Sequence, residues 1–182
     1  MPATLEVAPP AVRAPLGRRV SDEALVARVR QGDDRAFEQL FERHHPQLRS
    51  FCAHMLRDRD EGEDAVQQAF ISALKDLRGS TKPVDFRPWI YQIARNRCLT
   101  TIRLRKQHAE LGQVEERGFE YLGRSVGLRQ DLRQLLDDLH RLPNSQREAL
   151  VLSELGDLSG QEVAGVLGCP PAKVRALIFQ AR

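Results

Sequence analysis

The sequence predicts an all-α fold of two small helical domains joined by a flexible linker. Along residues 21–106 and 128–182, apolar residues recur at spacings of three and four, which is the period of amphipathic helices. No segment shows the alternation of apolar and polar residues that a half-buried strand requires. Residues 107–127 hold four glycines and interspersed acids without a sustained apolar stripe, which is typical of a linker.

Composition narrows the class of protein without naming a partner. Of the 182 residues, 41% are hydrophobic and 29% charged, as in an ordinary soluble globular chain. The formal net charge is only +3, so the placement of charge must indicate any nucleic-acid ligand. The three cysteines form no C-x-x-C pair, which argues against a disulfide framework or a zinc ribbon. Because there is neither a membrane-length apolar run nor a signal core, we expect a cytoplasmic protein.

The first domain is predicted over residues 21–106, after a proline-rich segment, 1–20, that we expect to be disordered. Ser21 is the expected N-cap of a first helix that ends at Gly32. A second helix is expected from about Asp34, and Pro46 is expected to begin a third. The acidic stretch 58–64 opens a longer helix, where its charge is favourable at the positive end of the dipole. The apolar stripe of that helix is Val66, Ala69, Phe70, Ala73, Leu74 and Leu77.

The next helix, expected from about Arg87 to Lys106, is distinguished by its charge. No acidic residue occurs between Phe86 and Glu110. The cations of this stretch are Arg87, Arg95, Arg97, Arg103, Arg105 and Lys106. A solvated helix face normally carries both signs, so cations without interleaved acids favour a nucleic-acid-binding face.

The C-terminal domain, 128–182, is predicted to end in a helix-turn-helix. Ser159 and Glu162 have the spacing of a capping box, which marks the start of a short helix. Gly168 is expected to end that helix in a left-handed conformation. Pro170 or Pro171 then suits the first turn of the next helix. After Cys169 the chain holds three cations and no acid, as expected of a helix that enters the major groove. A helical hairpin used only for packing remains the alternative.

Three segments, in order, resemble the ECF group of the sigma-70 family. Residues 60–70 (DEGEDAVQQAF) are similar to the family's polymerase-binding helix. Residues 86–97 (FRPWIYQIARNR) are similar to its strand-opening helix, which reads the −10 element. Residues 142–152 (LPNSQREALVL), followed by the helix-turn-helix, are similar to its −35-reading domain. The resemblance covers roughly residues 21–182 apart from the linker.

The resemblance implies a transcription initiation factor. It implies a region 2-like helical bundle over 21–106, a linker over 107–127 and a region 4-like helix-turn-helix over 128–182. The implied partners are the clamp helices of the largest subunit of RNA polymerase, the flap of the second-largest subunit, promoter DNA and an anti-sigma factor. It implies no catalysis, no cofactor, no metal and no membrane contact of its own.

The resemblance also implies roles for individual residues. The implied polymerase-binding residues are Asp64, Gln67 and Phe70. The implied −10-binding residues are Ser80, Thr81, Lys82, Arg95, Asn96, Arg97 and Arg103. The implied −35-binding residues are Ala172, Lys173, Arg175 and Gln180. The last helix is less polar than is usual in the family, which leaves open whether it reads a −35 element or docks on a protein.

Two other classes of protein remain as alternatives. An ordinary helix-turn-helix regulator acting without polymerase explains residues 158–182 but not the acid-free helix. A metal or thiol sensor would use His44, His45, Cys52 and His54, although Cys52 shares the apolar stripe of its helix and is better interpreted as core. The third class is an enzyme, but the sequence shows no Ser/His/Asp arrangement, phosphate loop or paired-carboxylate pocket.

Overall fold

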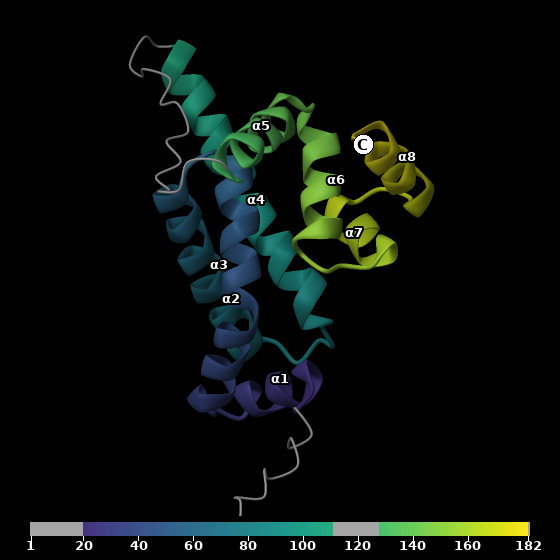
Figure 1. Ribbon diagram of the computed structural model, residues 1–182. Helices are drawn as coiled ribbons and strands as arrows, with labels where there is room; N and C mark the ends of the chain where they lie inside the picture. The colour runs from purple at the N-terminus through teal and green to yellow at the C-terminus, as the bar shows by residue number, and fades with distance from the viewer. Residues whose placement is uncertain (1–19, 111–127, 182) are drawn as a thin grey trace, which may run out of the picture.

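The computed structural model describes residues 20–110 and 128–181, and within them it contains eight helices and no strand (Figure 1). The all-α prediction is confirmed. The first domain consists of α1 (Asp22–Arg30), α2 (Asp34–Leu56), α3 (Arg59–Gly79) and α4 (Phe86–Glu110). The second consists of α5 (Leu128–Arg141), α6 (Asn144–Glu154), α7 (Gly160–Leu167) and α8 (Pro171–Ala181). Among these described helices, none is both long and apolar enough to cross a membrane.

The helix ends agree with the capping residues expected from the sequence. The Ser21 hydroxyl accepts a hydrogen bond from the amide of Ala24 at 3.3 Å, which satisfies a free donor of the first turn. At α7 both bonds of the capping box form: the amide of Glu162 donates to Ser159 and the amide of Ser159 to Glu162. Gly168 closes α7 with a left-handed φ of 64°.

One predicted helix boundary is wrong. Pro46 does not begin a new helix, because α2 runs unbroken from Asp34 to Leu56 with Pro46 inside it. A proline within a helix costs about 3 kcal/mol, since one backbone hydrogen bond is lost and the ring crowds the preceding turn. The buried stripe of Leu40, His44 and Leu48 continues in phase across the proline, and burial of that stripe holds the helix together.

Helix α4 ends later than the sequence predicts, which was at about Lys106. Helix α4 extends through Glu110, so the first residues assigned to the linker are helical. The rest of the linker and all but the last residue of the predicted N-terminal segment lie outside the described residues.

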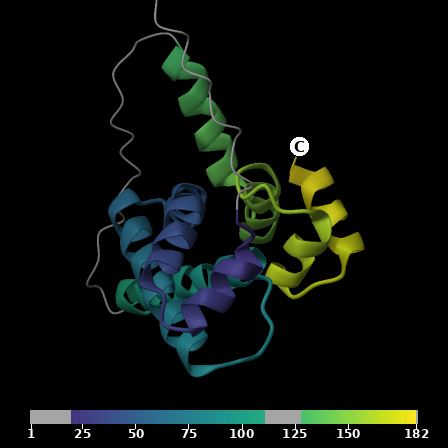
Figure 2. The same ribbon diagram turned by 90° about the horizontal axis from the view of Figure 1, so that it is seen from below.

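The core of the first domain lies between α2, α3 and α4, which cross one another in both views of the ribbon (Figures 1 and 2). Phe51 packs edge-on against Tyr91 of α4, with ring centroids 5.5 Å apart. Helices α2 and α3 pack closely at Gly62. A Cβ placed there would lie 2.8 Å from the backbone nitrogen of Ala53, so only glycine permits this crossing.

Replacing Gly62 by Ala is therefore expected to destabilise the chain by about 1–3 kcal/mol, the usual cost of overpacking a core. The matched control is Gly165→Ala in α7, where an added Cβ meets nothing within 4 Å. That change is expected to stabilise by about 0.5–1 kcal/mol, because alanine loses less backbone entropy than glycine. Urea denaturation measures both, and a Gly62 variant as stable as the parent would contradict the close crossing.

The second domain packs directly on the first. In Figure 1, α6 and α7 lie beside α4, and α5 lies across the end of α2. Leu152, Val163 and Val174 are buried and join the side chains of α2–α4 in one hydrophobic cluster. The two domains that the sequence predicts as separate units therefore form one closed body in this conformation.

Candidate protein- and DNA-binding surfaces

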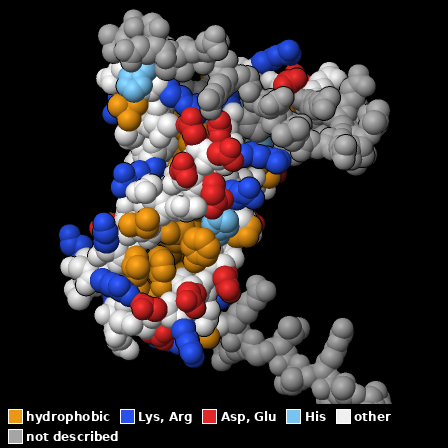
Figure 3. All heavy atoms as spheres, turned by 90° about the vertical axis from the view of Figure 1, so that its left-hand side faces the viewer, with side chains coloured by type: hydrophobic (Ala, Val, Ile, Leu, Met, Phe, Trp, Pro, Cys, Tyr) orange, Lys and Arg blue, Asp and Glu red, His pale blue; other side chains and the backbone are white. Residues whose placement is uncertain are grey.

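An uncovered apolar surface lies along α2 and α3, on the side of the molecule away from the second domain (Figure 3). We call it the α2–α3 patch; its residues are Phe37, Phe41, Ile71 and Leu74. Ile71 is 46% exposed, and the other three are partly buried. Phe70 lies beneath them, with its ring centroid 4.7 Å from that of Phe41. Apolar side chains gathered at one exposed place are typical of a protein interface.

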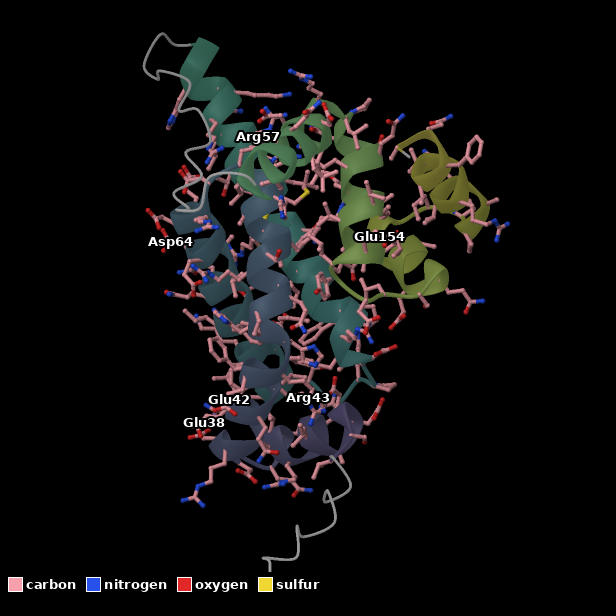
Figure 4. All side chains as sticks on the ribbon, in the orientation of Figure 1. Glu38, Glu42, Arg43, Arg57, Asp64 and Glu154 are labelled. Carbon is pink, nitrogen blue, oxygen red and sulfur yellow. The ribbon has the colours of Figure 1, made fainter. Side chains whose placement is uncertain are left out.

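Acidic side chains border the patch. Glu38 and Glu42 of α2 and Asp64 of α3 are exposed and point away from the second domain (Figure 4). Glu63 has its pKa lowered chiefly by a hydrogen bond with His45 at 2.9 Å, so it remains ionised. An apolar centre with an acidic border suits a partner with a basic, partly apolar surface.

The predicted polymerase-binding residues lie on or under this surface. Asp64 and Gln67 are exposed on α3, one turn apart, and Ile71 follows on the same face of the helix. Phe70, in contrast, is buried and supports the patch from below. The residue that the sequence-based list omits is Ile71. The available clue was that Ile71 is apolar, follows Phe70 directly and lies outside the predicted apolar stripe of its helix.

Helix α4 presents part of its basic side to solvent. Asn96, Arg97 and Arg103 are exposed, and Asn96 and Arg103 share one face two turns apart. Arg97 also donates a hydrogen bond to the Ser72 hydroxyl at 2.9 Å, which anchors α4 on α3. Arg105 differs from these, because it pairs with Glu61 and donates to the Leu56 carbonyl.

The predicted −10 residues before α4 lie in an anchored loop. Thr81 and Lys82 are exposed, and Ser80 is partly buried. The Ser80 hydroxyl accepts from the amide of Lys82 at 3.2 Å. The Lys82 carbonyl in turn accepts a hydrogen bond from Arg30 of α1, which ties the loop to the bundle at Lys82.

Helix α8 exposes all four predicted −35 residues: Ala172, Lys173, Arg175 and Gln180. Val174 is buried, and Leu177 and Ile178 are partly buried, so these three side chains form the inner face of α8. Gln180 accepts a hydrogen bond from Gln146 of α6 at 3.3 Å. Phe179 is 83% exposed and was missing from the sequence-based list. An outward helix with cations and no acid has the geometry of a helix-turn-helix reader.

Arg95, one of the predicted DNA-binding residues, does not lie on the exposed side of α4 with the others. Arg95 points into the junction between the domains and pairs with Glu148 of α6 at 2.9 Å. Arg87 crosses the same junction, donating to the Gly156 carbonyl at 3.3 Å. Arg57, the C-cap residue directly after α2, donates to the His140 carbonyl at the other end of the junction (Figure 4 labels Arg57). Sequence periodicity could not show these contacts, because they depend on how two domains dock.

The four residues considered for metal binding do not converge. His44 bonds to Asp22 at 2.6 Å, and His45 bonds to Glu63. The buried thiol of Cys52 lies against Cys98; this contact and burial raise its pKa well above the ordinary value. Each side chain has its own structural partner, which supports the interpretation of Cys52 as core.

Two histidines lie among arginines at the junction of α2 with α5 and α6. The ring centroids of His54 and His140 are 6.1 Å apart. Burial, then Arg147 and Arg59, lowers the pKa of His54. Burial, then chiefly Arg57, lowers the pKa of His140 to about 4, although Asp137 acts in the opposite direction. Both histidines are therefore neutral at pH 7 in the closed body.

Acidification is expected to loosen this junction. A histidine released to solvent regains a pKa near about 6.5, so the open form binds more protons. The closed form accordingly keeps its stability above about pH 6.5 and loses it as the pH falls toward about 4. Small-angle X-ray scattering is expected to give a larger radius of gyration at about pH 5 than at about pH 7.5. A His54→Gln, His140→Gln control is expected to reduce this change; an unchanged wild type would contradict the prediction.

These surfaces define a two-domain helical protein with an acid-bordered apolar face on α2 and α3 and exposed basic residues on α4 and α8. Comparison with known proteins agrees. The family model "Sigma-70 region 2" matches residues 40–108, and "Sigma-70, region 4" matches residues 132–182. The ECF RNA polymerase sigma-E factor of Escherichia coli K12 is 31% identical, over 92% of this chain and 93% of that protein. The sigma-E factor of Haemophilus influenzae is 28% identical, over 92% and 94%.

Solved structures show the same architecture. CnrH, in complex with the cytosolic domain of CnrY, superposes with a TM-score of 0.69 at 27% identity, covering 88% of this chain and 92% of that one. The sigma factor RpoE of Bartonella quintana, in complex with the anti-sigma factor NepR, superposes with a TM-score of 0.70 at 24% identity, covering 80% and 91%. The chain belongs to the sigma-70 family, in the ECF group of RNA polymerase sigma factors.

Proposed function

We propose that this chain is the promoter-specificity subunit of a bacterial RNA polymerase. The observation that carries the proposal is that regions 2 and 4 occur in order in one chain, and the exposure of predicted binding residues on both supports it. In this function the chain holds and opens DNA for another enzyme and catalyses no reaction itself.

The α2–α3 patch is proposed to bind the clamp helices of the largest polymerase subunit. Its apolar centre supplies buried area, and its acidic border supplies complementarity to a basic partner surface. The polar residues Asp64 and Gln67 lie at the edge of the contact, where they orient the partner. An anti-sigma factor that covers this patch would prevent polymerase binding, so we propose such a regulator as a further partner.

The loop 80–85 and helix α4 are proposed to bind the −10 element. Asn96, Arg97 and Arg103 supply cations and an amide for phosphates and base edges. Extruding a base from a duplex costs a few kcal/mol, so a loop that holds the extruded base stabilises the melted DNA. The anchored backbone of Ser80 and Lys82 suits that role, because less ordering is needed on binding.

Helix α8 is proposed to read the −35 element while the rest of the second domain contacts the flap of the second-largest subunit. Lys173 and Arg175 flank an exposed face on which Ala172 and Ala176 allow close approach to bases. Apolar side chains, phenylalanine among them, contact thymine methyl groups in the major groove. The exposed Phe179 is proposed to make such a contact.

The test is a comparison of DNA binding with and without sigma-free polymerase core. The proposal predicts weak binding of the free chain to a promoter duplex and tight, specific binding once core is added. Tight specific binding of the free chain, unaffected by core, would contradict the proposal and identify an ordinary helix-turn-helix regulator instead.

A further inference from the structure

An arginine of the first helix reaches the loop between α3 and α4. Arg30, in the last turn of α1, donates a hydrogen bond from a terminal nitrogen to the carbonyl oxygen of Lys82, 52 residues further along the chain. In Figure 1 this loop passes beside α1 on its way to α4. A charged donor makes a stronger hydrogen bond than a neutral one, so the contact restricts the backbone of the loop at Lys82.

Helix α1 holds Arg30 in place. Leu25, Val26 and Val29 of this helix are buried and belong to the hydrophobic core cluster. Arg30 directly follows Val29 and is itself partly buried. Burial of the three apolar side chains therefore fixes the helix from which Arg30 reaches the loop.

Both polar backbone groups of Lys82 are bound within the protein. Its carbonyl accepts from Arg30, and its amide donates to the Ser80 hydroxyl at 3.2 Å. The side chains of Thr81 and Lys82 are nevertheless exposed, so they remain available to a ligand. A loop whose backbone is already ordered loses less conformational entropy on binding than a free loop does.

The family comparison does not assign this contact. The region 2 match begins at residue 40, so α1 and Arg30 lie before it. The Nε of Arg30 is buried and has no hydrogen-bond partner among the residues that the structure describes. The contact with the loop therefore uses a terminal donor and its charge, and not the side nitrogen of the guanidinium.

We infer that Arg30 is a positioning residue for promoter opening: by holding the Lys82 carbonyl, it keeps loop 80–85 shaped to receive the base extruded from the −10 element. The inference rests on the proposed function of this loop. Arg30 acts through the backbone of Lys82 and not through a DNA contact of its own. Without it, the loop must be ordered each time a base is bound, so the hold on that base weakens while the contacts of α4 and α8 remain.

Three substitutions separate this role from simpler ones. Arg30→Met removes the donors and the charge but keeps an unbranched apolar stem that can pack as before. Arg30→Lys keeps a terminal cationic donor and loses the side nitrogen that has no partner, so it is expected to behave like the parent. The matched control is Arg28→Met, because Arg28 is an exposed cation on the same helix that pairs with Asp33 at 2.6 Å and not with the loop. Thermal melting checks that each variant is folded.

The experiment measures how firmly the polymerase holds single bases of the −10 strand. Core is reconstituted with each variant and titrated with a labelled fork from a promoter that the parent transcribes, in which the −10 strand is unpaired. Each unpaired base is replaced in turn by an abasic nucleotide. We expect one replacement to lower the affinity of the parent polymerase about tenfold, because that base occupies the loop.

The R30M polymerase is expected to bind the intact fork about tenfold more weakly than the parent, and the same abasic replacement is then expected to cost less than about threefold. The R30K and R28M polymerases are expected to keep the tenfold effect of the parent. A merely structural role of Arg30 would weaken binding of intact and abasic forks equally and leave their ratio unchanged.

Two results would overturn the inference alone: an R30M polymerase that keeps the parent's ratio of intact to abasic affinity, or an R30K polymerase that loses it. The proposed function of the loop would then stand. If no abasic replacement weakens binding by the parent, the loop captures no base, and its proposed role fails together with the inference.

Discussion

Replacing Ile71 by Asp is expected to weaken binding to RNA polymerase core on the order of a hundredfold, the loss that follows when a central apolar contact of an interface is removed. Ile71 is the most exposed side chain of the α2–α3 patch and lies outside the hydrophobic core cluster. In the complex an aspartate at this position would be taken out of water without a partner, which adds to the lost apolar contact.

The control for this variant is Leu104→Asp on α4. Leu104 is 50% exposed, against 46% for Ile71, so the two substitutions impose a similar change on the free chain. Fluorescence titration of labelled chain with sigma-free core measures both affinities. Equal loss in the two variants, or no loss at Ile71, would show that the patch is not the polymerase-binding surface.

The double change of Asn96 and Arg97 to Ala is expected to reduce promoter-dependent transcription by at least about thirtyfold, since each well-placed base or phosphate contact contributes about 1–3 kcal/mol. Both side chains are exposed on α4, so the first domain should still fold and bind polymerase. The salt dependence of promoter binding should also become shallower, because a cation that releases counterions has been removed.

Arg35→Ala is the matched control for this second prediction, because Arg35 is an exposed cation on α2 and not on the basic face of α4. Transcription from a fixed promoter, at equal occupancy of core, measures the effect. If the Asn96 and Arg97 variant transcribed as well as the Arg35 variant, α4 would not be the −10-binding helix.

Much of the fold followed from local patterns. Ser21, the Ser159–Glu162 capping box and Gly168 mark helix ends through short-range hydrogen bonds, which depend only on residues a few positions apart. Pro46 shows where such reasoning fails. Its local effect favours a helix start, but the burial of α2 against α3 is a tertiary contribution that outweighs it.

The exposure of the candidate binding residues was predicted less completely, for a related reason. Asp64, Gln67, Asn96 and Arg97 are exposed where the sequence placed them. Phe70 and Arg95 are not, because exposure depends on what packs against each residue: Phe70 lies beneath two aromatic neighbours, and Arg95 faces the second domain. Helical periodicity distinguishes the faces of one helix, but it does not show which face another domain covers.

The most direct test of the proposed function is reconstituted transcription. Purified chain is added to sigma-free bacterial RNA polymerase core, and transcripts are mapped on a pool of genomic promoters. We expect specific transcripts that require this chain, start downstream of a shared two-part motif, and disappear with the Ile71→Asp variant. Transcripts that do not depend on the chain, or a chain that fails to associate with core, would contradict this expectation.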